Sequence, residues 1–193
     1  MNLDTRTRAP VSASTSEPRY RDALAAAMAE LASEPRTYFL GQAVACPGTA
    51  IYGTLDAVPI ERRHELPVME ECQMGMTLGL ALAGWIPVSI YPRLNFLLLA
   101  VNQLVNHVDK LATMSRGGYR PHLIIRSSIG SVRPLDPQEQ HRGDYSRALA
   151  AMCPSIRVRV LDEPGEIIEE YRRCLRAPGA HLMIEWADSL AER

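Results

Sequence analysis

The chain has 193 residues, of which 47% are hydrophobic and 22% charged, and its formal net charge at pH 7 is −1. A chain of this size and composition buries a core without needing disulfides or a metal. The near-zero charge gives no bulk attraction to nucleic acid, and no apolar run is long enough for a transmembrane helix. Neither nucleic acid nor a membrane is therefore predicted as a partner.

Residues 1–18 show no hydrophobic period and no apolar core of a secretory signal, so we expect a disordered N-terminal tail and a cytoplasmic location. The four cysteines are scattered without any C-x-x-C pair. In a reducing compartment such cysteines are most simply small hydrophobic residues.

The remaining chain alternates between helical and extended patterns. In chain order we expect a helix at 19–33, a strand at 37–41, an irregular segment at 42–63, a brief extended stretch at 65–69, a helix at 70–84, a strand at 86–91, a helix at 95–115, a strand at 122–126, a helix at 144–152, a strand at 156–161, a helix at 165–175 and a strand at 181–186. Alternating strands and helices predict an α/β fold, a three-layer sandwich with a mainly parallel sheet flanked by helices. The domain is expected at 19–187, with a C-terminal tail at 188–193.

In a parallel sheet, ligands bind beyond the carboxyl ends of the strands. Four places are therefore candidates for a site: the loop after Gly41, the junction at Glu70, the segment after Tyr91, and the long polar loop at 127–144. The phosphate-binding P-loop, the Rossmann glycine pattern and the G-x-S-x-G nucleophile motif are absent. The five histidines are too widely spaced for a sequence-local metal site, and no metal ligand is predicted.

The segment from Pro67 to Gly84 carries an unusual pattern. Glu70 opens a helix directly after an extended stretch, and Gly75, Gly79 and Ala83 follow at a spacing of four. Each glycine costs a helix about 1 kcal/mol relative to alanine, so the stripe indicates a close approach of another backbone. Tight helix packing inside one domain would also explain the stripe, with Glu70 and Glu71 complementing the helix dipole.

An ordered set of short motifs accompanies this segment. It comprises Pro67-x-x-Glu70, Leu82-Ala83-Gly84, Pro87-Val88, Asn95-Phe96, Asn102-Gln103-Leu104-Val105-Asn106, Lys110-Leu111, Gly117-Gly118 and Gln140-His141. From about Tyr20 to Trp186 the chain resembles the pyrimidine-binding domain of thiamine diphosphate enzymes, in the branch of transketolase and the E1-β subunits of 2-oxoacid dehydrogenases. The resemblance implies the thiamine diphosphate-binding fold.

The resemblance also implies a role for Glu70. In this family a glutamate hydrogen-bonds to a ring nitrogen of the cofactor's aminopyrimidine and favours its imino tautomer, which then deprotonates the thiazolium carbon. Glu71 lies about 100° further round the helix and is expected to be a surface carboxylate. His141 matches a family histidine near the reactive end of the cofactor, so Glu70 and His141 are the predicted catalytic residues.

The predicted cofactor-binding residues are Glu70, Tyr91, Arg93 and Phe96. The family has an aromatic residue stacked on the pyrimidine, and either the Tyr91 ring or the Arg93 guanidinium plane could take that place. The family loop after the first strand often reads Gly-Glu-Asp, whereas this chain has Gly41-Gln42-Ala43. A carboxylate near the cofactor is therefore missing.

The diphosphate-binding motif of these enzymes, Gly-Asp-Gly with a later Asn-Asn, is absent from the sequence. The resemblance therefore implies an α-type partner subunit that holds the diphosphate and Mg²⁺, in an α₂β₂ heterotetramer that shares thiamine diphosphate. The family's C-terminal domain is also expected to be missing from this chain.

The leading hypothesis is the β-type subunit of a split enzyme that cleaves or forms a C–C bond next to a carbonyl, acting on a 2-oxoacid or a ketose. A non-catalytic assembly subunit of the same fold is the alternative, because Gln42 and the uncertain aromatic clamp allow that cofactor chemistry has been lost. A third hypothesis, a flavodoxin-like binding module, shares the fold class but leaves the Glu70 and His141 matches unexplained.

Overall fold

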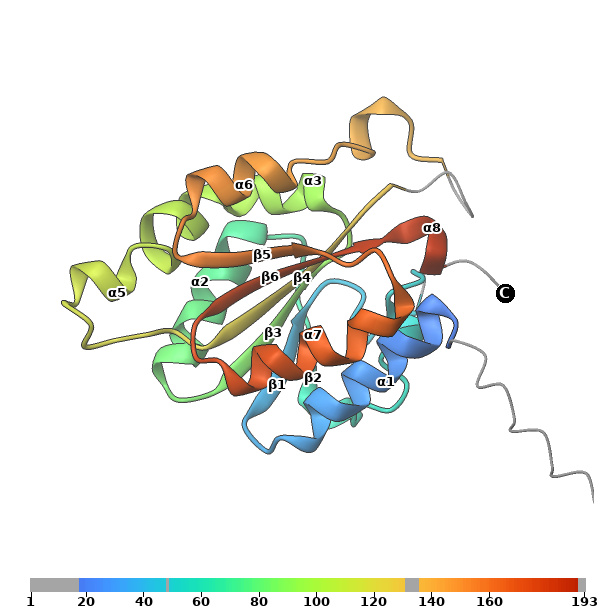
Figure 1. The fold of residues 1–193 in the computed structure, drawn as a ribbon, viewed down its shortest axis with the longest axis horizontal. Coiled ribbons are helices and arrows are strands. Elements are labelled where there is room, and N and C mark those ends of the chain that lie inside the picture. The colour runs from blue at the N-terminus through green and yellow to red at the C-terminus, as the bar shows by residue number, and fades with distance from the viewer. Residues whose placement is uncertain (1–17, 48, 131–135, 191–193) are drawn as a thin grey trace, which may run out of the picture.

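The computed structural model describes residues 18–47, 49–130 and 136–190, and it forms one six-stranded sheet (Figure 1). The strands are β1 (Thr37–Gly41), β2 (Arg63–Glu65), β3 (Ile86–Tyr91), β4 (Leu123–Ile129), β5 (Ile156–Val160) and β6 (Ala180–Trp186). Their order across the sheet is β2-β1-β3-β4-β6-β5, and every pair is parallel. The predicted α/β class with a parallel sheet is confirmed.

Helices cover both faces of the sheet, as expected for a three-layer sandwich. The α-helices are α1 (Tyr20–Ser33), α2 (Glu70–Leu82), α3 (Leu94–Leu97), α4 (Val101–Gln103), α5 (Leu111–Met114), α6 (Ser146–Met152), α7 (Pro164–Arg176) and α8 (Ala187–Leu190). Helices α1 and α7 lie side by side on one face, and α2, α3 and α6 pack on the other (Figure 1). No helix in the described part of the chain has the length and hydropathy needed to cross a membrane.

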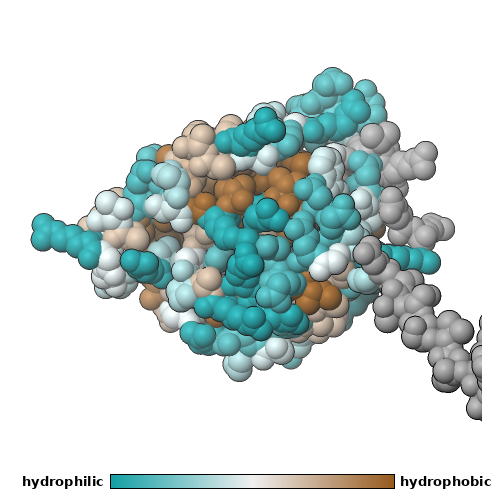
Figure 2. All heavy atoms as spheres, viewed as in Figure 1, coloured by the Kyte–Doolittle hydropathy of each residue, from teal (hydrophilic) through white to brown (hydrophobic). Residues whose placement is uncertain are grey.

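Two hydrophobic clusters form the core, one on each face of the sheet. Alternate residues of a strand point to opposite faces, so Ile124 joins the cluster beneath α1 and α7 while Ile125 joins the one beneath α2 and α6. In the view of Figure 2 the surface is mostly hydrophilic, with a hydrophobic area near the centre. Because a hydrophobic cluster covers each face of the sheet, the central strands β3 and β4 are buried along their whole length.

A charged pair lies inside the cluster beneath α1 and α7. Arg126 on β4 and Glu185 on β6 are both fully buried, and their side chains form two hydrogen bonds of 2.6 and 2.9 Å. The Tyr171 hydroxyl donates to the same Glu185 carboxylate at 2.6 Å. Burial opposes a charge on the guanidinium, but the Glu185 carboxylate more than offsets this and raises the pKa of Arg126.

The two edge strands are short or charged. β2 has only three residues, Arg63, His64 and Glu65. On β5, Arg157 is paired with Glu170, and Arg159 is paired with Glu166 at 2.8 Å, both partners being on α7. Both edges of the sheet are therefore polar.

Two predicted elements differ most in the structure. The helix expected at 95–115 is broken into α3, a 3₁₀ turn at Leu98–Ala100, α4, a π-helical turn at Leu104–Val108, and α5. The buried Asp109 side chain accepts a hydrogen bond from the Ser155 backbone N–H at 2.7 Å. Helical periodicity does not reveal a tertiary contact of this kind. The extended stretch expected at 65–69 is instead the strand β2, which ends at Glu65.

The chain ends also differ in part from the expectation. The segment expected as a tail at 188–193 begins inside α8, because Leu190 is buried in the core cluster beneath α1. Of the expected N-terminal tail, residues 1–17 lie outside the described residues, and α1 begins at Tyr20.

Candidate functional site

The loops predicted to carry the site meet at one edge of the sheet. Because the strands are parallel, their carboxyl ends share that edge, and the pairing places Gly41 opposite both Glu65 and Ile90. Gly41 has a φ of +136°, and a Cβ atom there would lie 2.2 Å from the Ile90 carbonyl oxygen. Glycine is therefore required where the chain leaves β1 toward the site.

Glu70 is the first residue of α2 and is only 5% exposed. The Gln42 side-chain amide donates to Glu70 Oε1 at 3.1 Å. Within the described residues no other donor reaches this carboxylate, so its second oxygen keeps its hydrogen-bonding capacity. The structure thus joins Glu70 to Gln42, the residue that stands where the family often has glutamate.

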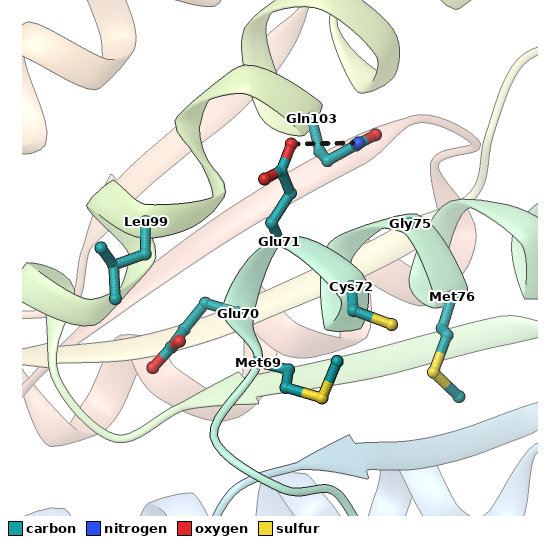
Figure 3. A pocket seen from close by; sticks show the side chains of 8 residues that line it. All are labelled: Met69, Glu70, Glu71, Cys72, Gly75, Met76, Leu99 and Gln103. Carbon is teal, nitrogen blue, oxygen red and sulfur yellow. Dashed lines mark hydrogen bonds between the residues drawn. The ribbon is translucent and has the colours of Figure 1, made fainter.

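An open groove of about 760 Å³ lies over the start of α2. Its lining comprises Met69, Glu70, Glu71, Cys72, Gly75, Met76, Leu99 and Gln103 (Figure 3). In Figure 3 the side chains of Glu70 and Glu71 point in different directions from the helix. The lining is mostly apolar, with the buried carboxyl of Glu70 at one end, an arrangement typical of a small-molecule site.

Glu71 is exposed, as expected of a surface carboxylate, and it also makes hydrogen bonds to a neighbouring helix. Its Oε1 accepts a hydrogen bond from Asn102 at 2.8 Å and another from Gln103 at 3.5 Å, of which Figure 3 shows the second. Both bonds tie α2 to α4. Asn102 is held in turn by Asn106, which donates to its side-chain oxygen at 2.9 Å. Glu71 therefore fixes one wall of the groove.

The two glycines in the stripe on α2 have no close neighbour among the described residues. A Cβ atom built at Gly75 or Gly79 would meet nothing within 4 Å. The neighbouring side chains of Met69 and Met76 are 51% and 40% exposed. The explanation by tight helix packing inside the domain is thus wrong for these two glycines, and this face of α2 is bare among the described residues.

Tyr91 lies beneath the site rather than in it. Its ring is fully buried, and its hydroxyl donates to the Glu70 carbonyl oxygen at 3.3 Å. Burial raises the pKa of this phenol. A ring without exposed surface cannot stack on a ligand, so we correct the predicted stacking role of Tyr91 to support of the Glu70 backbone.

The loops after β3 and β4 bring together two other predicted residues. The rings of Phe96 and His141 have centroids 5.2 Å apart, and the Asn95 side chain donates to the Gln140 carbonyl at 3.0 Å. Nδ1 of His141 and Nη1 of Arg93 are buried, and neither has a hydrogen-bond partner among the described residues. No hydrogen bond or ion pair among the described residues joins this group to Glu70. The roles of His141, Phe96 and Arg93 stay predictions.

Sequence reasoning missed several groove residues. Leu99 and Gln103 come from the segment expected to be one regular helix, and Met69, Cys72 and Met76 were not singled out. Asn102-Gln103 was part of the ordered resemblance, a signal that could have pointed to the groove. Among the described residues no three His, Cys, Asp or Glu side chains gather as a metal site.

Comparison with known proteins gives a consistent set of relatives, although no family model matches the chain. The mitochondrial pyruvate dehydrogenase E1 component subunit beta of Chaetomium thermophilum is 32% identical over 161 residues, which is 81% of this chain and 41% of that protein. The 3-methyl-2-oxobutanoate dehydrogenase subunit beta of Mycobacterium tuberculosis is 25% identical over 159 residues, or 80% of this chain and 44% of that protein. The chain thus spans about two fifths of the length of these relatives.

A solved structure shows the same fold. It is described as a split gene transketolase in an inactive beta4 tetramer, and it superimposes with a TM-score of 0.67 at 18% sequence identity. The match covers 87% of this chain and 50% of that one. The similarity in sequence and in fold extends over most of the described domain.

Proposed function

From the relationship of this chain to the E1 β subunits of 2-oxoacid dehydrogenases, we propose that it is the pyrimidine-domain subunit of a split thiamine diphosphate-dependent enzyme. The reaction cleaves or forms a C–C bond next to a carbonyl, on a 2-oxoacid or a ketose. The observation that carries the proposal is the buried Glu70 carboxyl at the edge of the groove, with one oxygen held by Gln42.

The residues of the groove fit the pyrimidine half of the cofactor. A carboxyl that is nearly buried and has a free oxygen suits a hydrogen bond to a ring nitrogen, and the apolar walls formed by Leu99, Met69 and Met76 suit a flat ring. When bound, thiamine diphosphate supplies an electron sink at its thiazolium carbon. With the cofactor bound, Glu70 would hold a proton at the pyrimidine nitrogen, and His141 would move a proton near the substrate.

A partner subunit supplies the other half of the site. The sequence has no diphosphate motif, and the bare face of α2 at Gly75 and Gly79 gives a second polypeptide a surface for close approach. We propose an α-type subunit that binds the diphosphate and Mg²⁺ in an α₂β₂ assembly. The cytoplasmic location stays a prediction.

The test uses the tagged chain recovered from its host with its partner, in buffer with thiamine diphosphate and Mg²⁺. The partner is identified by mass spectrometry and is expected to carry Gly-Asp-Gly and Asn-Asn. The complex should turn over a 2-oxoacid or a ketose, and Glu70→Gln should reduce kcat by about 100-fold or more while the complex still assembles. Equal activity of the two complexes would overturn the proposal.

The non-catalytic alternative makes the opposite prediction for the cofactor. Gln42 in place of an acidic residue is the observation that favours it. A complex whose melting temperature does not change on addition of thiamine diphosphate and Mg²⁺ would support this alternative, because a ligand that binds the native state must stabilise it.

A further inference from the structure

Glu65 lies at the end of β2 and binds a row of backbone N–H groups in the loop that follows β1. Its Oε1 accepts from Ala43 at 2.8 Å, and its Oε2 accepts from Val44 and Ala45, each at 2.7 Å. The Cys46 amide donates to Oε2 as well, at 3.2 Å. Successive N–H groups that converge on one anion form a nest, and here the anion belongs to the chain itself.

The loop is held in a conformation that it would not adopt freely. Ala43 has a φ of +58°, in the left-handed region that costs a non-glycine residue about 1 kcal/mol or more. Burial acts to raise the pKa of Glu65, but the backbone donors outweigh it and lower the pKa. The ionised carboxylate and the buried Val44 side chain therefore stabilise the turned backbone together.

The same loop begins with Gln42, whose side chain reaches Glu70. The preceding residue, Gly41, is fixed by its close approach to β3. The backbone N–H of Gln42 donates to the Ile90 carbonyl oxygen at 3.3 Å. After Gln42, the backbone is fixed by Glu65. Gln42 is thus anchored on both sides, and its Nε2 donates to Glu70 Oε1 at 3.1 Å.

We propose that Glu65 is a positioning residue: its carboxylate gathers the N–H groups of residues 43–46 and thereby holds the Gln42 amide against Glu70. The side-chain NH₂ of Gln42 is a hydrogen-bond donor that does not ionise, and it binds Oε1 of Glu70. This hydrogen bond therefore fixes which oxygen of Glu70 is turned inward. The other oxygen is left toward the groove. The consequence for catalysis rests on the proposed function of Glu70, whereas the link from Glu65 to Gln42 does not.

The first test uses the chain alone. In Glu65→Gln, backbone amides of residues 42–46 should exchange about tenfold faster than in wild type, because the nest loses its anion.

The NMR resonance of the Gln42 side-chain amide, assigned with Gln42→Ala, should shift when Glu70→Gln is introduced into wild type. In the Glu65→Gln background the same change should leave that resonance where it is. Glu61→Gln, an exposed acid four residues earlier, is the matched control and should change neither signal.

The second test uses the complex with its partner. Glu65→Gln and Gln42→Ala should each weaken thiamine diphosphate binding about tenfold, the loss of one hydrogen bond to a charged group, and the double variant should bind no more weakly than Gln42→Ala alone. Additive losses would overturn the proposal, since Glu65 would then act independently of Gln42. Unchanged exchange of residues 42–46 would overturn it as well. If wild-type complex fails to bind the cofactor, the proposed function fails, while the measurements on the chain alone still decide the role of Glu65.

Discussion

Arg126 and Glu185 form an ion pair between neighbouring strands with no exposed surface on either side chain. Removing one partner of a buried pair leaves the other charge uncompensated, which costs about 3–5 kcal/mol. We therefore expect Glu185→Gln to lower the free energy of unfolding by an amount in this range, measured by urea denaturation at neutral pH.

The double variant Arg126→Met with Glu185→Met is the control for this pair. Replacing both charges with apolar side chains of similar length is often neutral. Because the Tyr171 hydroxyl also donates to Glu185, both variants are made in a Tyr171→Phe background, where most of the stability lost in Glu185→Gln should return in the double variant. A double variant as unstable as Glu185→Gln would show that shape, rather than charge, determines the effect at this position.

The glycines of α2 and β1 should respond in opposite ways to alanine. Gly75→Ala should stabilise the isolated chain by up to about 1 kcal/mol, because its Cβ meets nothing and alanine favours the helix. Gly41→Ala should destabilise it by at least about 2 kcal/mol, because of its positive φ and the Ile90 carbonyl. Thermal unfolding of both variants measures these effects. Destabilisation by Gly75→Ala would contradict the finding that a side chain at this position meets no neighbour.

Changing Gln42 to an acid should destabilise the chain. In Gln42→Glu two carboxylates would lie within hydrogen-bond distance of each other, and like charges at that distance repel. The melting temperature at neutral pH should therefore be lower for Gln42→Glu than for Gln42→Ala, which removes the hydrogen bond without adding a charge. Equal melting temperatures of the two variants would contradict the contact between residues 42 and 70.

The pKa of Glu65, lowered by its backbone donors, sets a second pH dependence. A carboxyl with a depressed pKa in the folded state contributes stability above its ordinary value of 4.5, and this is lost as the pH falls through the folded value. The stability difference between wild type and Glu65→Gln should therefore be full at about pH 7 and shrink at about pH 3. A stability difference between wild type and Glu65→Gln that grows on acidification would contradict the stabilisation of the ionised Glu65 carboxylate by the backbone N–H groups.

The four thiols should divide into two classes. Cys46 and Cys72 are exposed, whereas Cys153 and Cys174 are buried, and burial raises their pKa values to about 11 and about 12. A thiol reagent should modify two cysteines rapidly in the native chain and all four after unfolding. Cys72→Ser should leave a single fast thiol, and modification of Cys72 should obstruct the groove that it lines.

The sequence was sufficient for elements whose pattern is local. β1 and β3 have the bounds expected from their apolar runs, and α2 begins at Glu70 as predicted. β2 was misplaced because its three residues are all polar. The breaks within 95–115 were missed because apolar spacing does not report tertiary contacts such as that between Asp109 and Ser155.

The key carboxyl group of the candidate site was predictable from the sequence, but the hydrogen bonds that position it were not. Glu70 followed from its place at a helix start together with the resemblance. The hydrogen bond from Gln42 and the nest around Glu65 join residues 28 and about 20 positions apart. Such contacts depend on β2 pairing with β1 in one register, which no local pattern contains.

The polar edges of the sheet limit how the protein can assemble. An unpaired strand edge invites the addition of a strand from another chain, and charged or very short edge strands prevent this. Here one edge has three residues, and the other presents the Arg157 and Arg159 ion pairs with α7. In the proposed assembly, the subunits would therefore associate through side chains on helices and loops. Such contacts would preserve the order of the strands and leave the edge beyond their carboxyl ends open to the proposed partner.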